Sequence, residues 1–171
     1  MSDAWAALIA GRAFIPLFGF GMTADKAKSR PRVYLVEDSP IILNLLVELI
    51  ETTKATIVGH ADNAAAAIAD IAALHPDVVT VDIRLRAGTG FDVLEGIAIN
   101  HDGKPPVRIV LTNYVTDAYR NAARRLGVDY FFDKARQIRE VLGVLDSIGA
   151  KDDGAERSAT GALTRSGPAL C

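Results

Sequence analysis

The residues of this chain best suited to metal and phosphoryl chemistry each follow an apolar segment. The stretch from Pro76 to Val81 is rich in β-branched residues and leads to a single carboxylate, Asp82. A short run of this kind is typical of a buried strand in a parallel sheet. Three further runs lead to polar side chains in the same way: Val33–Val36 to Glu37 and Asp38, Val107–Leu111 to Thr112, and Tyr130–Phe132 to Lys134. Because ligands of open parallel sheets bind beyond the carboxyl ends of the strands, we expect these side chains to meet there.

This group of side chains is suited to a divalent cation and a phosphoryl group. Magnesium takes oxygen ligands and is usually held by one or two carboxylates, which Asp38 and Asp82 would supply, with Glu37 assisting through water. Lys134 would bring a positive charge to a phosphate, and Thr112 a hydroxyl donor. A carboxylate beside a metal and a phosphate donor is able to act as a nucleophile and form an aspartyl phosphate. The hypothesis is therefore phosphoryl transfer to Asp82, with Mg²⁺ as the cofactor.

Each of these residues also has a simpler explanation when it is taken singly. Glu37 and Asp38 would cap the following helix, where the helix dipole favours a carboxylate. Thr112 would reflect the preference of threonine for strands, and Lys134 would be a solvated loop residue. The occurrence of all of them at strand ends favours a common site over these separate explanations.

Strand-like and helix-like segments alternate from Arg32 onward, which predicts an α/β fold with a doubly wound, five-stranded parallel sheet. The expected strands are Arg32–Glu37, Thr56–Ala61, Pro76–Asp82, Val107–Thr112 and Asp129–Phe132. The first expected helix begins at Pro40 after a capping residue, and the others cover Ala64–Leu74, Phe91–Asn100, Thr116–Leu126 and Arg136–Ile148. We therefore expect a loose N-terminal extension over residues 1–30, one domain over residues 31–149, and a disordered tail over residues 150–171, where no apolar period remains.

The overall composition is that of a soluble globular protein. Half of the 171 residues are hydrophobic and the formal net charge is −2, so no global basic excess indicates nucleic-acid binding. The single cysteine, Cys171, excludes an intramolecular disulfide and a cysteine-based metal site, which fits a cytoplasmic protein. His60, His75 and His101 have no metal-ligand spacing and are interpreted as incidental.

The first residues form an apolar segment, Trp5 to Met22, that is interrupted by Arg12 and Pro16. A secretion signal needs positive charge before an uninterrupted apolar core, and a membrane span needs a longer unbroken one. We therefore expect neither secretion nor membrane association. Translation from Met22 would make the preceding residues no part of the native protein, a hypothesis that mass spectrometry of the native N-terminus tests.

Four motifs in order resemble those of the receiver domain of two-component response regulators. They are Val-Glu-Asp-Ser-Pro at Val36, Val-Asp-Ile-Arg-Leu at Val81, Val-Leu-Thr-Asn at Val110 and Phe-Phe-Asp-Lys-Ala at Phe131. The resemblance covers about Arg32 to Gly149 and implies a flavodoxin-like sheet with strand order 2-1-3-4-5. It also implies phosphorylation of Asp82 by a histidine kinase or phosphotransfer protein.

The same resemblance implies roles for the residues around Asp82. Mg²⁺ would be bound by Asp38, Asp82 and the backbone carbonyl of Arg84, with Glu37 in the outer shell. Thr112 would swing toward the phosphoryl group, and Phe131, three residues before the lysine, would turn inward with it.

The usual readout surface of the family comprises the fourth helix, the fifth strand and the fifth helix. Here that surface carries one tyrosine and a group of arginines: Tyr119, Arg120, Arg124, Arg125, Arg136 and Arg139. A solvated charged face explains any one of them. Their clustering favours docking of a downstream protein or self-association into a homodimer, and nucleic-acid binding is less favoured.

Three residues depart from the family pattern, although Gly90 matches its usual glycine. Arg86 stands where a proline is usual after the phosphorylated aspartate, and Asn113 replaces a small residue after Thr112. Ala135 replaces the proline after the lysine, and a cis peptide without proline would cost about 2.5–4 kcal/mol. Arg84 and Tyr114 flank the site and are expected to change the lifetime of the phosphoryl group.

Because the chain leaves no room for an output domain, we expect a stand-alone response regulator. Two other functions compete with this interpretation. A magnesium-dependent phosphohydrolase of the haloacid-dehalogenase type needs a second aspartate two positions after the nucleophile, where this chain has Arg84. Arginine cannot donate and retake a proton at neutral pH, so this enzyme class is disfavoured. The other alternative is a receiver-fold scaffold that binds partners without being phosphorylated.

Overall fold

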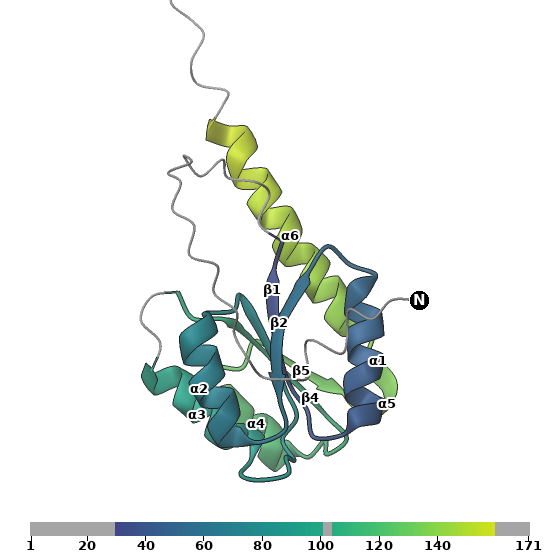
Figure 1. The fold of residues 1–171 in the computed structure, drawn as a ribbon, viewed down its shortest axis with the longest axis vertical. Helices are drawn as coiled ribbons and strands as arrows, with labels where there is room; N and C mark the ends of the chain where they lie inside the picture. The colour runs from purple at the N-terminus through teal and green to yellow at the C-terminus, as the bar shows by residue number, and fades with distance from the viewer. Residues whose placement is uncertain (1–29, 101–103, 160–171) are drawn as a thin grey trace, which may run out of the picture.

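The computed structural model describes residues 30–100 and 104–159, which form a central sheet covered by helices (Figure 1). The strands are β1 (Arg32–Val36), β2 (Thr56–Ala61), β3 (Val78–Val81), β4 (Val107–Thr112) and β5 (Tyr130–Asp133). The helices are α1 (Pro40–Glu51), α2 (Ala64–Leu74), α3 (Gly90–Asn100), α4 (Asp117–Arg125), α5 (Lys134–Gln137) and α6 (Glu140–Ala159). None of the described helices is both long enough and apolar enough to cross a membrane.

The sheet is parallel throughout and has the order β2-β1-β3-β4-β5. This is the flavodoxin-like, doubly wound arrangement expected from the sequence, and the expectation is confirmed. Val36 pairs with Val81, and Val81 with Val110, so that β1 and β3 end at the same level and β4 continues beyond it to Thr112. The residues that follow these strands therefore emerge side by side at one edge of the sheet.

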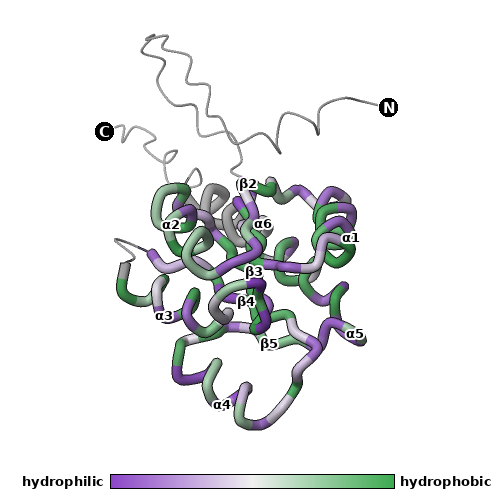
Figure 2. Tube along the Cα trace, turned by 60° about the horizontal axis from the view of Figure 1, so that its bottom comes forward, coloured by the Kyte–Doolittle hydropathy of each residue, from purple (hydrophilic) through white to green (hydrophobic). Residues whose placement is uncertain are grey.

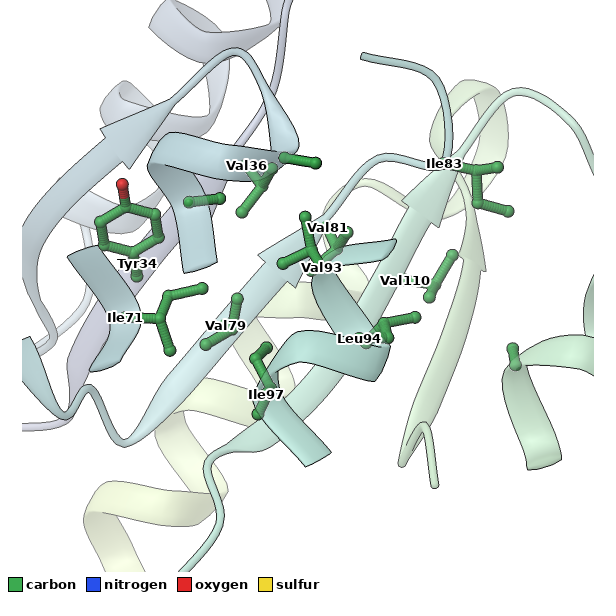
Figure 3. Close-up of a cluster of buried hydrophobic side chains, with 13 residues drawn as sticks. Tyr34, Val36, Ile71, Val79, Val81, Ile83, Val93, Leu94, Ile97 and Val110 are labelled. Atoms are coloured by element: carbon green, nitrogen blue, oxygen red, sulfur yellow. The ribbon is translucent and has the colours of Figure 1, made fainter. Parts of the chain in front are cut away.

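Side chains of successive strand residues enter two hydrophobic layers, one on each face of the sheet. Tyr34 and Val36 pack with residues of α2, α3 and α4, and Figure 3 shows this layer around Val79 and Val81. Val33 and Leu35 pack on the other face with residues of α1 and α6. The alternation follows from the two-residue period of a strand. In Figure 2 the helices show alternating apolar and polar segments, as expected where one helix face covers the sheet.

Helix starts follow the capping signals of the sequence. Ser39 and Asn63 adopt extended backbone conformations, and their side chains accept hydrogen bonds from the backbone N–H groups of Ile42 and Ala66. Pro40 occupies the start of α1, where the missing N–H costs nothing. These caps fix where the chain turns after β1 and β2, at the edge of the sheet that carries the candidate site.

The C-terminal helical region differs from the expected single helix over Arg136–Ile148. It is split into a short α5, whose N-terminal cap is Asp133, and a longer α6 that continues to Ala159 and extends away from the sheet in Figure 1. The expected tail over residues 150–171 therefore begins with helix. An apolar period identifies only the part of a helix that packs on a core, whereas alanine, lysine and glutamate are good helix formers without one. Residues 160–171, and the N-terminal extension up to residue 29 with Met22, lie outside the described residues.

Candidate functional site

Three carboxylates lie together at the edge of the sheet where β1 and β3 end. One carboxylate oxygen each of Glu37, Asp38 and Asp82 lies within 4.8 Å of the others. Glu37 and Asp82 are only 4% and 7% exposed. Their backbone N–H groups continue the sheet, since Glu37 donates to the carbonyl of Ala61 and Asp82 to that of Val36, both at 2.9 Å. The strands thus hold these two acids in fixed positions.

Lys134 follows the edge strand β5 and reaches two of these carboxylates. Its Nζ atom lies 2.5 Å from Oδ2 of Asp82 and 2.6 Å from Oε2 of Glu37, and its side chain is 3% exposed. The residue follows β5 directly and begins α5, where Asp133 accepts a 2.9 Å hydrogen bond from the N–H of Ala135. No described peptide bond is cis, so the chain leaves Lys134 through a trans peptide to Ala135.

Burial and charge pairing have opposite effects on the pKa of Glu37. Desolvation raises the pKa of its carboxyl, and the hydrogen bond and positive charge of Lys134 partly oppose this. Asp82 nearby adds to the increase, whereas the N–H of Ser39, 3.2 Å from Oε1 of Glu37, lowers the pKa slightly. Three carboxylates beside one ammonium give the cluster a formal excess of negative charge, and the ammonium contacts only Glu37 and Asp82. A divalent cation would offset that excess.

The geometry of the three acids fits a magnesium ion. Mg²⁺ binds oxygen at about 2.0–2.1 Å, so its ligands stand about 2.9 Å apart when adjacent and about 4.2 Å apart when opposite. One carboxylate oxygen each of Glu37, Asp38 and Asp82 lies within 4.8 Å of the other two, so two of these acids could bind one ion directly with the third acting through water. The donor set is all oxygen, as Mg²⁺ prefers.

The loop after β3 turns tightly around Asp82. The N–H of Arg84 lies 3.3 Å from Oδ1 of Asp82, and the N–H of Gly90 donates to the carbonyl of Ile83 at 2.9 Å. A Cβ atom at Gly90 would lie 2.2 Å from the carbonyl oxygen of Asp82, far inside van der Waals contact. Glycine is therefore required at this position, because the start of α3 packs directly on the backbone of Asp82.

Arg86 joins this loop to the loop between β2 and α2. Its backbone N–H donates to the carbonyl of Asp62 at 3.0 Å, and its Nη1 lies 3.1 Å from Oδ2 of the same residue. The adjacent N–H of Ala64 donates to the carbonyl of Ala87. A proline at position 86 has no N–H and could not make the first of these bonds. Arg86, in place of the proline usual in the family, thus adds a backbone hydrogen bond and an ion pair between the two loops.

Thr112 lies on β4 and Phe131 on β5, the two strands beyond β3. Thr112 is fully buried at the end of β4, and its Oγ1 accepts a 3.3 Å hydrogen bond from the N–H of Tyr114. Phe131 is half-buried in the hydrophobic layer of α2, α3 and α4, and the guanidinium of Arg120 lies 4.9 Å from its ring centroid. The other expected partner of the site, Arg84, points its side chain to Tyr114.

The structure thus brings four of the expected site residues, Glu37, Asp38, Asp82 and Lys134, into one cluster. Thr112 ends the neighbouring strand β4. Phe131 lies on β5, one strand farther from the acids, where it pairs with Val110 of β4. Sequence reasoning missed the link between Arg86 and Asp62 and the stacking of Arg120 on Phe131. No local pattern signals either contact, since both join segments that only the fold brings together.

Comparison with known proteins shows similarity to one family. A family model described as the response regulator receiver domain matches residues 33–146. The chain is 29% identical over 129 residues to the DNA-binding transcriptional activator DevR/DosR of Mycobacterium tuberculosis, which covers 74% of this chain and 56% of the relative. It is 29% identical over 141 residues to a protein-glutamate methylesterase/protein-glutamine glutaminase of Vibrio vulnificus, covering 81% of this chain and 41% of the relative.

Among solved structures, a LuxR-family DNA-binding response regulator from Staphylococcus aureus matches with a TM-score of 0.63 and 26% identity. The match covers 70% of this chain and 98% of that one. The chain spans about half or less of the length of the two curated relatives, so the DNA-binding and methylesterase activities in their names are properties of those longer proteins.

Proposed function

The chain belongs to the response regulator receiver family, and from this premise we propose that Asp82 accepts a phosphoryl group from a histidine kinase or phosphotransfer protein. The proposal rests above all on the contact of Lys134 Nζ with Oδ2 of Asp82 at 2.5 Å, inside a cluster of three carboxylates. A buried lysine in this position neutralises part of the charge on Asp82 and would do the same for a phosphoryl group attached to it.

In the proposed reaction a carboxylate oxygen of Asp82 forms a bond to phosphorus. The phosphorus–nitrogen bond of the donor phosphohistidine breaks, and the imidazole nitrogen keeps the electron pair and takes a proton from solvent. Lys134 would stay against the transferred group and offset its charge. Glu37, also held by Lys134, would keep the ammonium oriented toward Asp82.

Magnesium is the proposed cofactor. Asp38, Asp82 and the backbone carbonyl of Arg84 would bind it, with Glu37 in the outer shell through water. When bound, the ion supplies charge neutralisation for the phosphoryl oxygens.

The response to phosphorylation would pass from Thr112 to the surface formed by α4, β5, α5 and the start of α6. Thr112 would turn toward the phosphoryl oxygen, and Phe131 would turn inward with it. Apart from a long 3.9 Å approach of Arg136 to Asp133, the arginines of this surface have no ion pair among the described residues. They are Arg120, Arg124, Arg125, Arg136 and Arg139. Unpaired surface cations favour docking of an acidic downstream partner or a second copy.

A phosphohydrolase remains the less favoured alternative. Its general acid would occupy position 84, but the side chain there is an exposed arginine whose Nη1 donates a 2.6 Å hydrogen bond to Tyr114. This guanidinium cannot protonate a leaving group at neutral pH. A scaffold that is never phosphorylated is the second alternative, and the experiment below separates it from the proposal.

The test is phosphorylation by phosphoramidate with and without Mg²⁺, read as intact mass, with Asp82→Asn as the matched control. We expect one added phosphoryl group that requires Mg²⁺ and is absent in the variant. Beryllofluoride binding, measured by fluorine NMR, covers an adduct too short-lived for mass analysis. A wild-type protein that neither gains phosphate nor binds beryllofluoride would refute the proposal and leave the scaffold function.

A further inference from the structure

Arg120 and Phe131 form a contact that joins α4 to β5. The guanidinium carbon of Arg120 lies 4.9 Å from the centroid of the Phe131 ring, within the range of a cation–π interaction. Both residues are half-buried. No carboxylate forms an ion pair with Arg120 among the described residues, so the ring is the principal partner of its charge.

Few contacts hold α4 on the sheet, which makes this one important. Ala123 is the only buried residue of the helix. Tyr119 packs edge-on against Phe91 of α3, with ring centroids 5.5 Å apart. At the C-terminal end, Nη1 of Arg108 donates a 2.7 Å hydrogen bond to the carbonyl of Leu126. A lightly packed helix responds readily when one of its contacts is lost.

We infer that Arg120 is a positioning residue that holds Phe131 in its present orientation and so opposes the phosphorylated state. This inference rests on the proposed function, because it takes the inward turn of Phe131 as the change that phosphorylation favours. When the ring turns inward, Arg120 loses its partner and α4 loses one of its few attachments. The freed guanidinium then adds its charge to the surface of α4, where Arg124 and Arg125 are already exposed.

Thermodynamic linkage gives the sign of the effect. A contact made only in the present orientation of Phe131 lowers the population of the state with the ring turned inward, and with it the apparent affinity for any ligand that requires that state. A cation–π contact at a partly exposed site contributes about 0.5–1 kcal/mol, and 1.4 kcal/mol corresponds to a factor of ten. Removal of Arg120 is therefore expected to tighten the binding of beryllofluoride with Mg²⁺ about two- to fivefold.

The experiment compares wild type, Arg120→Ala and Lys54→Ala, each with Phe131 or with Phe131→Leu. Lys54 is an exposed residue between α1 and β2. Lys54→Ala therefore removes one positive charge, as Arg120→Ala does, but leaves the contact with the Phe131 ring in place. Beryllofluoride affinity is measured by fluorine NMR, and the ring signals of labelled phenylalanine are recorded without ligand. Lys54→Ala is expected to leave both readouts as in wild type. The gain in affinity on removal of Arg120 is expected to vanish in the Phe131→Leu background.

The outcomes separate this inference from the proposed function. If wild type binds beryllofluoride and Arg120→Ala binds it no more tightly, the inference is wrong while the switch stands. A gain that persists with Phe131→Leu would also overturn it, since the effect would not pass through the ring. If wild type does not bind, the proposed function fails, and the inference as a statement about switching fails with it. In that case unchanged ring signals in Arg120→Ala would further exclude the contact itself.

Discussion

The guanidinium of Arg84 donates a 2.6 Å hydrogen bond to the hydroxyl of Tyr114 and lies 4.9 Å from the centroid of its ring. Arg84 belongs to the loop that follows Asp82, and Tyr114 to the loop that follows Thr112. The pair therefore connects the two loops that begin at the proposed phosphorylation site and its proposed switch residue. This link indicates in which direction Arg84 and Tyr114 change the lifetime of the phosphoryl group, which the sequence leaves open.

Loss of the pair is expected to shorten the lifetime of phosphorylated Asp82. With Arg84→Ala or Tyr114→Ala the two loops lose their link, and water gains easier access to the phosphoryl group. Tyr114→Phe keeps the ring but removes a hydrogen bond worth about 1 kcal/mol, so its effect should be smaller, about fivefold or less. The measurement is the decay of the phosphorylated species by intact mass after removal of the donor. Decay rates equal to that of wild type in all three variants would contradict this role.

The strand ends and helix caps could be predicted from the sequence because they depend on local signals. The ranges expected for β2 and α2 agree with the structure residue for residue, since their bounds are set by a β-branched run and by the Asn63 cap. The strand order, expected from the family resemblance, brings Glu37, Asp38, Asp82 and Lys134 together. Their chemical roles stay predictions.

The features that the sequence did not predict are of two kinds. Some are contacts between segments distant in the sequence, and one is a helical segment that has no apolar residues at helical spacing. The stacking of Arg120 on Phe131 and the link of Arg86 to Asp62 each require the finished fold. The expected end of the helix at Ile148 is wrong, because the apolar stripe of α6 ends where the helix leaves the core while the helix itself continues to Ala159. Charged surface positions carry little information about either kind of feature.

Removal of the buried ammonium should destabilise the protein strongly. Lys134→Met leaves Glu37 and Asp82 almost buried without their common partner. Breaking a buried ion pair by removing one member typically costs about 3–5 kcal/mol, and we expect a loss near the lower end. Urea unfolding in the presence of EDTA measures it. Arg136→Met, on an exposed side chain in the same helix, serves as the control and should change the unfolding free energy little.

The raised pKa of Glu37 predicts a definite sign for the dependence of stability on pH. Its carboxyl binds a proton more tightly in the folded chain than in the unfolded one, mainly because burial disfavours the charged form. Between the unfolded pKa and the higher folded pKa the native state therefore holds more protons, so this residue's contribution to stability falls as the pH rises. Below that window Glu37 is neutral in both states and its burial as a charge costs nothing.

Glu37→Gln isolates this effect. We expect the unfolding free energy of wild type, measured in EDTA, to fall relative to that of the variant as the pH rises through the window. Outside the window the difference between the two proteins should be constant. A difference that does not change with pH would show that pairing with Lys134 balances desolvation, and a change in the opposite direction would show that pairing outweighs it.

Arg86 should tolerate replacement by alanine better than replacement by proline. Arg86→Ala keeps the N–H that donates to the carbonyl of Asp62 and loses only an ion pair whose arginine side chain is 70% exposed. Exposed pairs contribute about 0–1 kcal/mol. Arg86→Pro restores the residue usual in the family but removes the N–H, which should cost about 1 kcal/mol more. Equal unfolding free energies for the two variants would show that the backbone hydrogen bond contributes nothing.

Gly90→Ala should disturb both stability and phosphorylation. The new Cβ would lie 2.2 Å from the carbonyl oxygen of Asp82, a backbone atom that cannot move aside as the end of a flexible side chain could. Overpacking of this kind typically costs about 1–3 kcal/mol, and relief requires Asp82 to shift relative to Lys134. We therefore expect a lower unfolding free energy together with slower labelling by phosphoramidate.

Gly143→Ala is the matched control for that variant. A Cβ at Gly143, inside α6, meets nothing within 4 Å, so alanine there should raise stability by about 0.5–1 kcal/mol through its better helix propensity. Labelling of Asp82 should be unchanged. If Gly90→Ala labels at the wild-type rate despite its lower stability, the position of Asp82 does not depend on the start of α3, and the close approach of Gly90 serves packing alone.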